Sequence, residues 1–274
     1  MPRRTRVDVE LVRRGLARSR QQAAELICAG KVSIDGMPAV KPGTAVAATA
    51  ALSVAGDAER GWVSRGAHKL IGALDTFGIS VEGRRCLDAG ASTGGFTDCL
   101  LQAGAAKVYA VDVGHSQFRA SLAVDPRVRA MERTNISAIR MADLDPPIDL
   151  AVADLSYLTL SVALPKIRAL FHDPSRFDIV ALIKPLYEGL AQADVTNLAA
   201  IEPVLCTLFE RLEGQGVHIH AACVSPLLGG RGAIEFLGRF GGQAGLARDV
   251  AAHLAIEDAR ATPPVDLAAL VSRV

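Results

Sequence analysis

The stretch LDAGASTGGFTD, residues 87–98, places Gly90, Gly94 and Gly95 directly after an aspartate that ends a short apolar run. Glycines between a strand and a helix let the backbone approach a ligand closely. Their spacing is not the G-x-G-x-x-G of dinucleotide sites and lacks the G-K-[ST] of phosphate loops, which disfavours both classes of ligand. Taken alone, the turn is equally typical of a structural connection between a strand and a helix.

A second acidic residue gives the turn a more specific interpretation. Asp112 ends the apolar run KVYAV, 24 residues after Asp88, where a carboxylate can accept hydrogen bonds from both ribose hydroxyls of an adenosine. A glycine turn with such an acid, and without a pyrophosphate cradle, fits S-adenosylmethionine. We therefore expect a cofactor site that contains Asp88, Gly90, Ser92, Gly94, Gly95, Phe96, Thr97, Asp112 and Asp154.

The elements that must position these residues are strand-like apolar runs alternating with helical stretches. We expect strands near residues 85–88, 107–111, 128–131, 149–153, 179–183, 217–222 and 234–237, a helix from the glycines to Ala103, and a helix over 198–213. Such alternation predicts an α/β fold with a mainly parallel, Rossmann-like sheet and helices on both faces. Because ligands bind beyond the carboxyl ends of parallel strands, Asp88, Asp112, Asp154 and Lys184 should form a polar cluster there.

The N-terminal segment differs from the rest of the chain in charge. Residues 1–60 carry ten Lys and Arg against six Asp and Glu, whereas the remainder carries 20 against 23. Asp8 is expected to cap a short first helix, Ser19 and Gln22 form a capping box for a second, and a hairpin follows. The basic residues Arg13, Arg14, Arg18, Arg20 and Lys31 then suit a phosphate backbone, although a solvated charged surface is the alternative.

The stretch LVRRGLARSRQQAAELICAGKVSIDG also resembles the alpha-L type RNA-binding domain of ribosomal and pseudouridine-synthase proteins. The resemblance implies nucleic-acid binding by this segment. We expect a small α+β domain over residues 1–59, a linker over 60–64 that contains Trp62, and a methyltransferase domain over 65–274. The tail from about residue 245 is expected to form two short helices split by Pro263 and Pro264, and a homodimer through it is one possibility.

Composition excludes several classes of protein. Half of the residues are hydrophobic and 22% are charged, which is typical of a globular chain. The apolar runs are too short for a membrane span and none resembles a secretory signal, so we expect a cytoplasmic protein. Five scattered cysteines without a C-x-x-C pair argue against a disulfide framework, and the histidines of VHIH lack a third metal ligand.

Several motifs together resemble the TlyA family, which belongs to the FtsJ-like class of methyltransferases acting on ribose 2'-hydroxyls of ribosomal RNA. They are RVDVELVRRGLARSRQQAAEL, VSRGAHKL, CLDAGASTGGFTD, ADLS, IKP and IEF, and they cover nearly the whole chain. The resemblance implies a catalytic tetrad of Lys69, Asp154, Lys184 and Glu235. Lys184 would be the base, Asp154 and Glu235 would orient it, and Lys69 would place the hydroxyl.

The chemistry explains why these residue types are useful. A ribose hydroxyl is a weak nucleophile, and a partly desolvated lysine near other cations can take its proton. A carboxylate and a second lysine can orient the base and the hydroxyl, and much of the catalysis is in-line positioning of the oxygen.

Departures from the family pattern gather around the expected acceptor pocket. KPLYE stands where the family usually has KPQFE, Ala233 replaces an asparagine, Tyr157 replaces a phenylalanine, and His115 lies in an altered GHSQF. Two acceptors therefore remain open. Ribosomal RNA is the leading expectation, and the alternative is a small aromatic molecule such as an indole, whose pocket would include Tyr157, Tyr187 and His115.

Two further alternatives are not enzymes. The first is an RNA-binding adaptor without catalysis, and the second is a pore-forming haemolysin, a label that the family sometimes carries. The sequence offers the haemolysin alternative neither an apolar span nor an aromatic-rich amphipathic helix. Cofactor binding would argue against the adaptor.

Overall fold

The computed structural model describes residues 4–13, 17, 19–28, 30, 32–34, 37–39, 41–47, 50, 52–54, 62–262 and 264. The chain divides into an N-terminal unit, which contains residues 1–61, and a body of residues 62–265. Arg14, Arg18 and Lys31 lie outside the described residues, as does most of the tail after residue 262.

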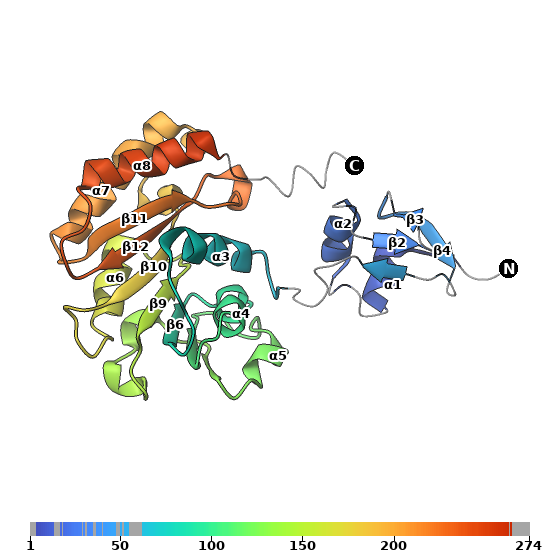
Figure 1. The fold of residues 1–274 in the computed structure, drawn as a ribbon, viewed down its shortest axis with the longest axis horizontal. Coiled ribbons are helices and arrows are strands. Elements are labelled where there is room, and N and C mark those ends of the chain that lie inside the picture. The colour runs from blue at the N-terminus through green and yellow to red at the C-terminus, as the bar shows by residue number, and fades with distance from the viewer. Residues whose placement is uncertain are drawn as a thin grey trace. The chain divides into compact units, whose positions relative to one another are not determined.

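The body is built on one seven-stranded sheet with the order β11–β12–β10–β9–β6–β7–β8 (Figure 1). Its strands are β6 Arg85–Ala89, β7 Lys107–Val111, β8 Val128–Met131, β9 Leu150–Ala153, β10 Asp178–Ile183, β11 His218–Val224 and β12 Phe236–Gly241. The first five are parallel to one another, whereas β12 runs antiparallel between β10 and β11. The predicted mainly parallel sheet is confirmed.

The last strand is longer than the sequence suggests. The expected strand covered residues 234–237, whereas β12 runs from Phe236 to Gly241. A Cβ at Gly238 would come within 2.7 Å of the Phe240 ring. The strand needs a glycine at position 238 because a larger residue would collide with Phe240. Local sequence propensity does not show this contact.

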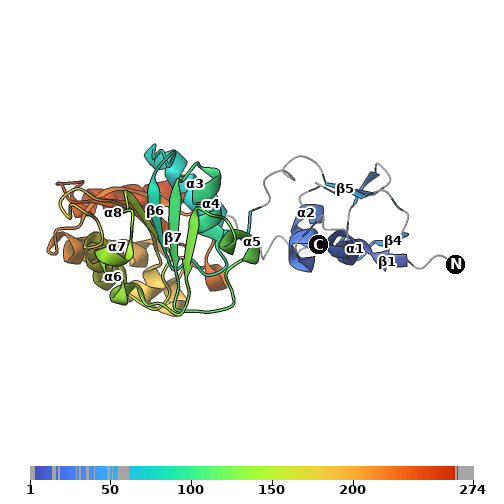
Figure 2. The same ribbon diagram turned by 90° about the horizontal axis from the view of Figure 1, so that it is seen from below.

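Helices cover both faces of the sheet (Figures 1 and 2). Helices α3 Gly66–Phe77, α4 Gly95–Gln102 and the short α5 Ala120–Ala123 pack on one face, and α6 Leu160–Arg168, α7 Leu198–Glu213 and α8 Arg248–Ala261 pack on the other. Short 3-10 helices connect these elements: η2 Ile136–Ala138, η3 Met141–Asp143, η4 Pro185–Glu188, η5 Gln192–Asp194 and η6 Gly230–Gly232. Alternate residues of each strand, such as Leu87 and Cys86, enter the two opposite cores.

The N-terminal unit contains two helices and two small sheets. Helix α1 spans Val7–Arg13 and α2 spans Arg20–Cys28; β1 Arg4–Arg6 pairs with β4 Ala45–Ala47, and β2 Val32–Ile34 lies between β3 Met37–Pro38 and β5 Leu52–Val54. Ser19 Oγ accepts from the backbone N–H of Gln22 at 3.1 Å, so Ser19 caps α2 as predicted.

The prediction that Asp8 caps α1 is wrong, because the helix already begins at Val7. The Asp8 carboxylate is buried and accepts hydrogen bonds from Arg6 at 3.0 Å and from Arg20 at 3.2 Å. The same carboxylate also accepts from the backbone N–H of Val9 at 2.9 Å, so it serves the first turn from inside the helix while it pairs with the two guanidinium groups.

Leucines of equal size on α7 and α8 should separate core packing from surface effects. Leu205 is completely buried, whereas Leu254 is 49% exposed. We expect Leu205→Ala to lower the free energy of unfolding by about 2–5 kcal/mol and Leu254→Ala by about 0.5 kcal/mol or less. Urea unfolding of both variants measures the difference, and equal losses would contradict the assignment of α7 to the core.

Candidate active site

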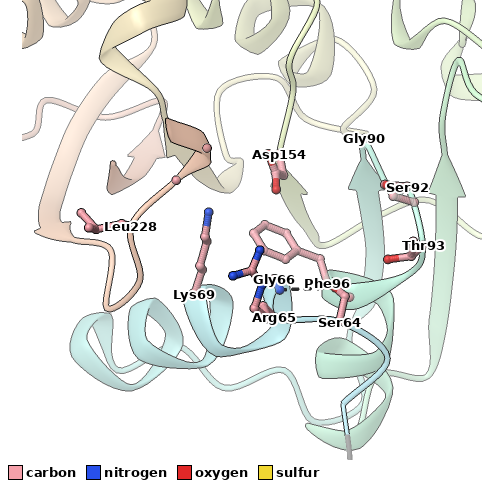
Figure 3. A pocket seen from close by; sticks show the side chains of 14 residues that line it. Ser64, Arg65, Gly66, Lys69, Gly90, Ser92, Thr93, Phe96, Asp154 and Leu228 are labelled. Carbon is pink, nitrogen blue, oxygen red and sulfur yellow. Dashed lines mark hydrogen bonds between the residues drawn. The ribbon is translucent and has the colours of Figure 1, made fainter. Parts of the chain in front are cut away.

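Two pockets open at the sheet edge where the parallel strands end. The first, which we call the turn pocket, has a volume of about 270 Å³ and is lined by residues 64–66, Lys69, 90–93, 95–96, Asp154 and 228–230 (Figure 3). The second, the lysine pocket, has a volume of about 520 Å³ and is lined by Ser156, residues 184–187, Gln192, Gly230, Ala233 and Glu235. Since Gly230 lines both, the two pockets adjoin.

Two ion pairs join the pockets. Lys69 Nζ lies 2.5 Å from Glu235 Oε2, and Lys184 Nζ lies 2.6 Å from Asp154 Oδ1. Each pair combines a residue of the turn pocket with a residue of the lysine pocket. The four residues of the expected tetrad are thus brought together at the boundary. Glu235 was expected to orient Lys184, but the ion pair that it forms is with Lys69.

The topology of the sheet explains this arrangement. Asp154 and Lys184 directly follow the parallel strands β9 and β10, so both lie at the carboxyl edge. Because β12 is antiparallel and its first residue, Phe236, pairs with Ile183, the register places Glu235 opposite Lys184 at the same edge. Lys69 reaches the edge from the first turn of α3, a helix that the sequence analysis did not predict.

Lys184 has further neighbours that sequence reasoning missed. Its Nζ donates to Ser156 Oγ at 2.7 Å and lies 5.7 Å from the centroid of the Tyr187 ring. Glu188, at the end of η4, accepts a hydrogen bond from the backbone N–H of Leu160 at 2.8 Å, and burial raises the pKa of Glu188. This contact fastens η4, which carries Tyr187, to the start of α6.

The glycines of the turn are required by neighbouring protein atoms. A Cβ at Gly90, where φ is +89°, would lie 2.2 Å from the carbonyl oxygen of Asp154. A Cβ at Gly94, where φ is +98°, would lie 2.4 Å from Leu122, and one at Gly95 would lie 2.1 Å from Ser64 Oγ. The turn can therefore pass close to the β9 edge and to the segment before α3, and it leaves backbone exposed in the pocket.

The acids at the ends of β6 and β7 lie behind the turn. Asp88 is completely buried, and its Oδ2 accepts from Thr97 Oγ1 at 2.6 Å. Asp112 accepts from the backbone N–H groups of Ser92 at 2.8 Å and Gly114 at 2.6 Å. Asp88, Thr97, Asp112 and Gly94 are not among the described residues that line the two pockets, whereas Gly90, Ser92, Gly95, Phe96 and Asp154 line the turn pocket.

The residues expected for a small aromatic acceptor do not come together. Tyr187 lines the lysine pocket, but Tyr157, which is 38% exposed, and His115 are absent from the described lining of both pockets. In the N-terminal unit, the charge of Arg13 is paired with Glu10 at 2.6 Å and that of Arg20 with Asp8.

The turn pocket fits the chemistry of S-adenosylmethionine. Residues 90–93 of the turn form one wall of the pocket, and the Phe96 ring lies beside it (Figure 3). The carboxylate of Asp154 enters from the β9 edge, while Arg65 and Lys69 enter from the side of α3. Charges of both signs around an apolar ring suit a ligand that carries a sulfonium, an ammonium and a carboxylate together with a nucleoside.

The Rossmann-like sheet, the glycine turn and the paired charges at its edge define the class of the protein as an S-adenosylmethionine-dependent methyltransferase. Residues 62–234 match the family model of FtsJ-like methyltransferases, and residues 5–50 match that of the S4 domain. The chain belongs to the TlyA group of the FtsJ-like methyltransferase family.

Individual relatives agree with this assignment. The 16S/23S rRNA (cytidine-2'-O)-methyltransferase TlyA of Mycobacterium tuberculosis is 54% identical over 86% of this chain and 89% of its own length. Hemolysin A of Brachyspira hyodysenteriae is 35% identical over 86% of this chain and 99% of its own length. A solved structure of a Streptococcus thermophilus protein, provisionally called a hemolysin, is 34% identical with a TM-score of 0.68 and covers 95% of this chain and 98% of its own. In the described part of this chain, no helix is long and apolar enough to cross a membrane.

Two glycines with positive φ offer a matched test of the turn. Gly90→Ala must displace the Asp154 carbonyl, whereas Gly78→Ala, at the end of α3 with φ +62°, meets no atom within 4 Å. We expect Gly78→Ala to cost about 1 kcal/mol of stability and Gly90→Ala about 2–4 kcal/mol. Only Gly90→Ala should weaken binding of S-adenosylmethionine in calorimetry; equal binding by both variants would contradict the contact.

Asp88 should make stability depend on pH. Burial raises the pKa of Asp88 to about 7, although the hydrogen bond from Thr97 acts to lower it. Because this pKa exceeds the usual value of about 3.9, the contribution of Asp88 to stability is complete below about pH 4 and is lost as the pH rises through about 7. Asp88→Asn has no proton to lose, so the melting temperature of the wild type should fall relative to that of the variant between about pH 4 and 7. Parallel melting curves across that range would contradict the burial of a titrating carboxyl.

Proposed function

We propose that this protein transfers the methyl group of S-adenosylmethionine to a ribose 2'-hydroxyl of ribosomal RNA. The observation that carries the proposal is the pair of ion pairs, Lys69–Glu235 and Lys184–Asp154, at the boundary of two adjoining pockets. A group transfer between two ligands needs such a boundary, since the donor and the acceptor must meet there. The activity named for the relative from Mycobacterium tuberculosis supports the same acceptor.

In this proposal the turn pocket holds the cofactor, which supplies an electrophilic methyl group when bound. Residues 90–93, Gly95, Phe96 and Asp154 contact it, while Asp112 holds the turn and remains a candidate for the ribose hydroxyls. Asp88 and Thr97 support the turn from beneath. These roles follow from position and hydrogen bonding, and the binding experiment with Gly90→Ala tests them.

Lys184 acts as the general base on the acceptor: its neutral amine takes the proton of the ribose 2'-hydroxyl. Its Nζ lines the lysine pocket and is only slightly exposed, with 13% of the side chain accessible. The ion pair with Asp154 and the hydrogen bond to Ser156 Oγ fix the direction of the Lys184 side chain, which is the positioning that an in-line transfer needs. Glu235 neutralises and orients Lys69, and Lys69 places the acceptor hydroxyl.

The N-terminal unit brings RNA to the body. Residues 1–59 form the RNA-binding domain, 60–64 the linker and 65–274 the methyltransferase domain in this proposal, and the partner is a ribosomal subunit or its RNA. Arg13, Arg14, Arg18, Arg20 and Lys31 supply basic groups for phosphates. A ribosomal substrate places the protein in the cytoplasm. The small-molecule alternative gains no support, because Tyr157 and His115 are absent from the described lining of the lysine pocket.

Methyl transfer to ribosomal particles from cells that lack the protein tests this function. We expect tritium from labelled S-adenosylmethionine to appear on a ribose of the RNA. Lys184→Ala should lower the rate by about 10²–10⁴-fold, the range of general base catalysis, while Lys166→Ala, which removes an amine from the end of α6, should leave it unchanged.

Calorimetry with S-adenosylmethionine separates the outcomes. Unlabelled RNA together with intact cofactor binding would overturn RNA as the acceptor. Labelled RNA with full activity in Lys184→Ala would retain RNA methylation but overturn the role of Lys184.

A further inference from the structure

A third pocket lies at the edge of the body sheet opposite to the active site. It has a volume of about 290 Å³ and opens where β10 begins at Asp178 and where β12 ends at Gly241. The five- and six-residue strands of the sheet separate it from the catalytic boundary by about 17 Å. The mechanism proposed above uses none of its residues.

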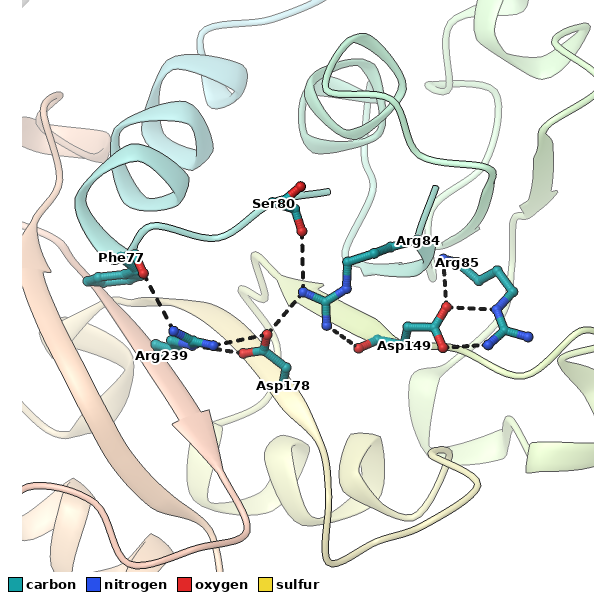
Figure 4. Close-up of polar contacts among 7 residues, drawn as sticks. All are labelled: Phe77, Ser80, Arg84, Arg85, Asp149, Asp178 and Arg239. Carbon is teal, nitrogen blue, oxygen red and sulfur yellow. Dashed lines mark hydrogen bonds and ion pairs between the residues drawn. The ribbon is translucent and has the colours of Figure 1, made fainter. Parts of the chain in front are cut away.

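An ionic network forms one wall of this pocket (Figure 4). Asp178 accepts from Arg239 at 3.0 and 3.3 Å and from Arg84 at 3.1 Å. Asp149 accepts two side-chain hydrogen bonds from Arg85, at 2.7 and 2.5 Å. Three guanidinium groups therefore share two carboxylates, so the network carries one positive charge in excess.

The arginines also retain unused donors. Arg84 donates to Asp178 and to the carbonyl oxygens of Ser80 and Asp149, and Arg239 donates twice to Asp178 and once to the carbonyl oxygen of Phe77. A guanidinium has five N–H groups. In each arginine two of them have no hydrogen-bond partner among the described residues.

Further cationic and polar groups also line this pocket. Arg176 is exposed, and no described carboxylate lies within ion-pair distance of it; the nearby Asp173 is held by Ser175 at 2.6 and 2.9 Å. The His220 ring packs against Gly241, where a Cβ would lie 2.8 Å away, and its Nε2 lies 3.0 Å from the carbonyl oxygen of Gln243. The ring is thereby held in one orientation beside the cavity.

A network that only fastened the strands together would balance its charges and would need no cavity. In this protein Arg84, Arg239 and Arg176 line one cavity from three separate segments of the chain. The two carboxylates that line it with them, Asp149 and Asp178, already accept hydrogen bonds from arginines. Planar guanidinium forks match the oxygens of a tetrahedral anion and bind it through charge-assisted hydrogen bonds. We propose that this third pocket binds a phosphate group, either free phosphate or a backbone phosphate of RNA.

The proposal does not depend on the methyl acceptor, and inorganic phosphate is the first probe. We expect phosphate to raise the melting temperature of the full chain saturably, relative to chloride at equal ionic strength and pH. Arg176→Ala should weaken phosphate binding about tenfold, the loss expected for one charge-assisted hydrogen bond. The matched control is Arg211→Ala, which removes an exposed arginine near the end of α7 and should change nothing.

Binding of a ribosomal RNA fragment at several salt concentrations distinguishes the two sources. A backbone phosphate in the pocket predicts that Arg176→Ala lowers the salt slope by about one unit, while free phosphate as the ligand predicts an unchanged slope. If phosphate acts only through ionic strength and the slope is unchanged, the proposal is wrong. It is equally wrong if wild type and Arg176→Ala bind both probes alike, or if Arg211→Ala shows the same losses.

Discussion

The rest of the body depends on four charges that are held partly out of water at one edge of a sheet. Lys69, Glu235, Lys184 and Asp154 have side chains between 7% and 28% exposed. Charges at such positions are costly unless each has a partner of opposite sign. The sheet supplies the partners through topology: two parallel strands end in Asp154 and Lys184, and one antiparallel strand begins after Glu235 beside them. Removing any one of the four leaves a neighbour unpaired in the place where the two ligands must meet.

Much of this arrangement could be predicted from the sequence. Buried parallel strands are continuous apolar runs, so β7 was predicted with its observed bounds and β6, β9 and β10 to within a residue or two. The edge strand β8, which is only partly buried, was also predicted with its observed bounds. The acids and the lysine that follow those runs were therefore placed at one edge before any contact was known. Lys69 and Glu235 entered only through family resemblance, because nothing local marks them.

Other features depend on contacts between segments far apart in the chain. Arg65, the residue directly before α3, makes no capping hydrogen bond, and the backbone N–H of Gly66 instead donates to Ser64 Oγ at 3.3 Å, so the helix start lacks a capping side chain at the usual position. The pairing of Glu235 with Lys69 spans 166 residues, and the glycine turn is explained by atoms of Asp154, Leu122 and Ser64. Sequence spacing suggested that the glycines make room for a ligand, whereas at these positions they first make room for the protein itself.

The position of β12 has a consequence for how the chain reaches its native state. Strand β11 precedes β12 in the chain but joins the sheet only through it, so until residues 236–241 have been synthesised β10 remains an open sheet edge. The insertion of β12 closes that edge, and the same event delivers Glu235 to Lys69. A nascent or truncated chain that stops before β12 therefore carries the cofactor turn without a complete site.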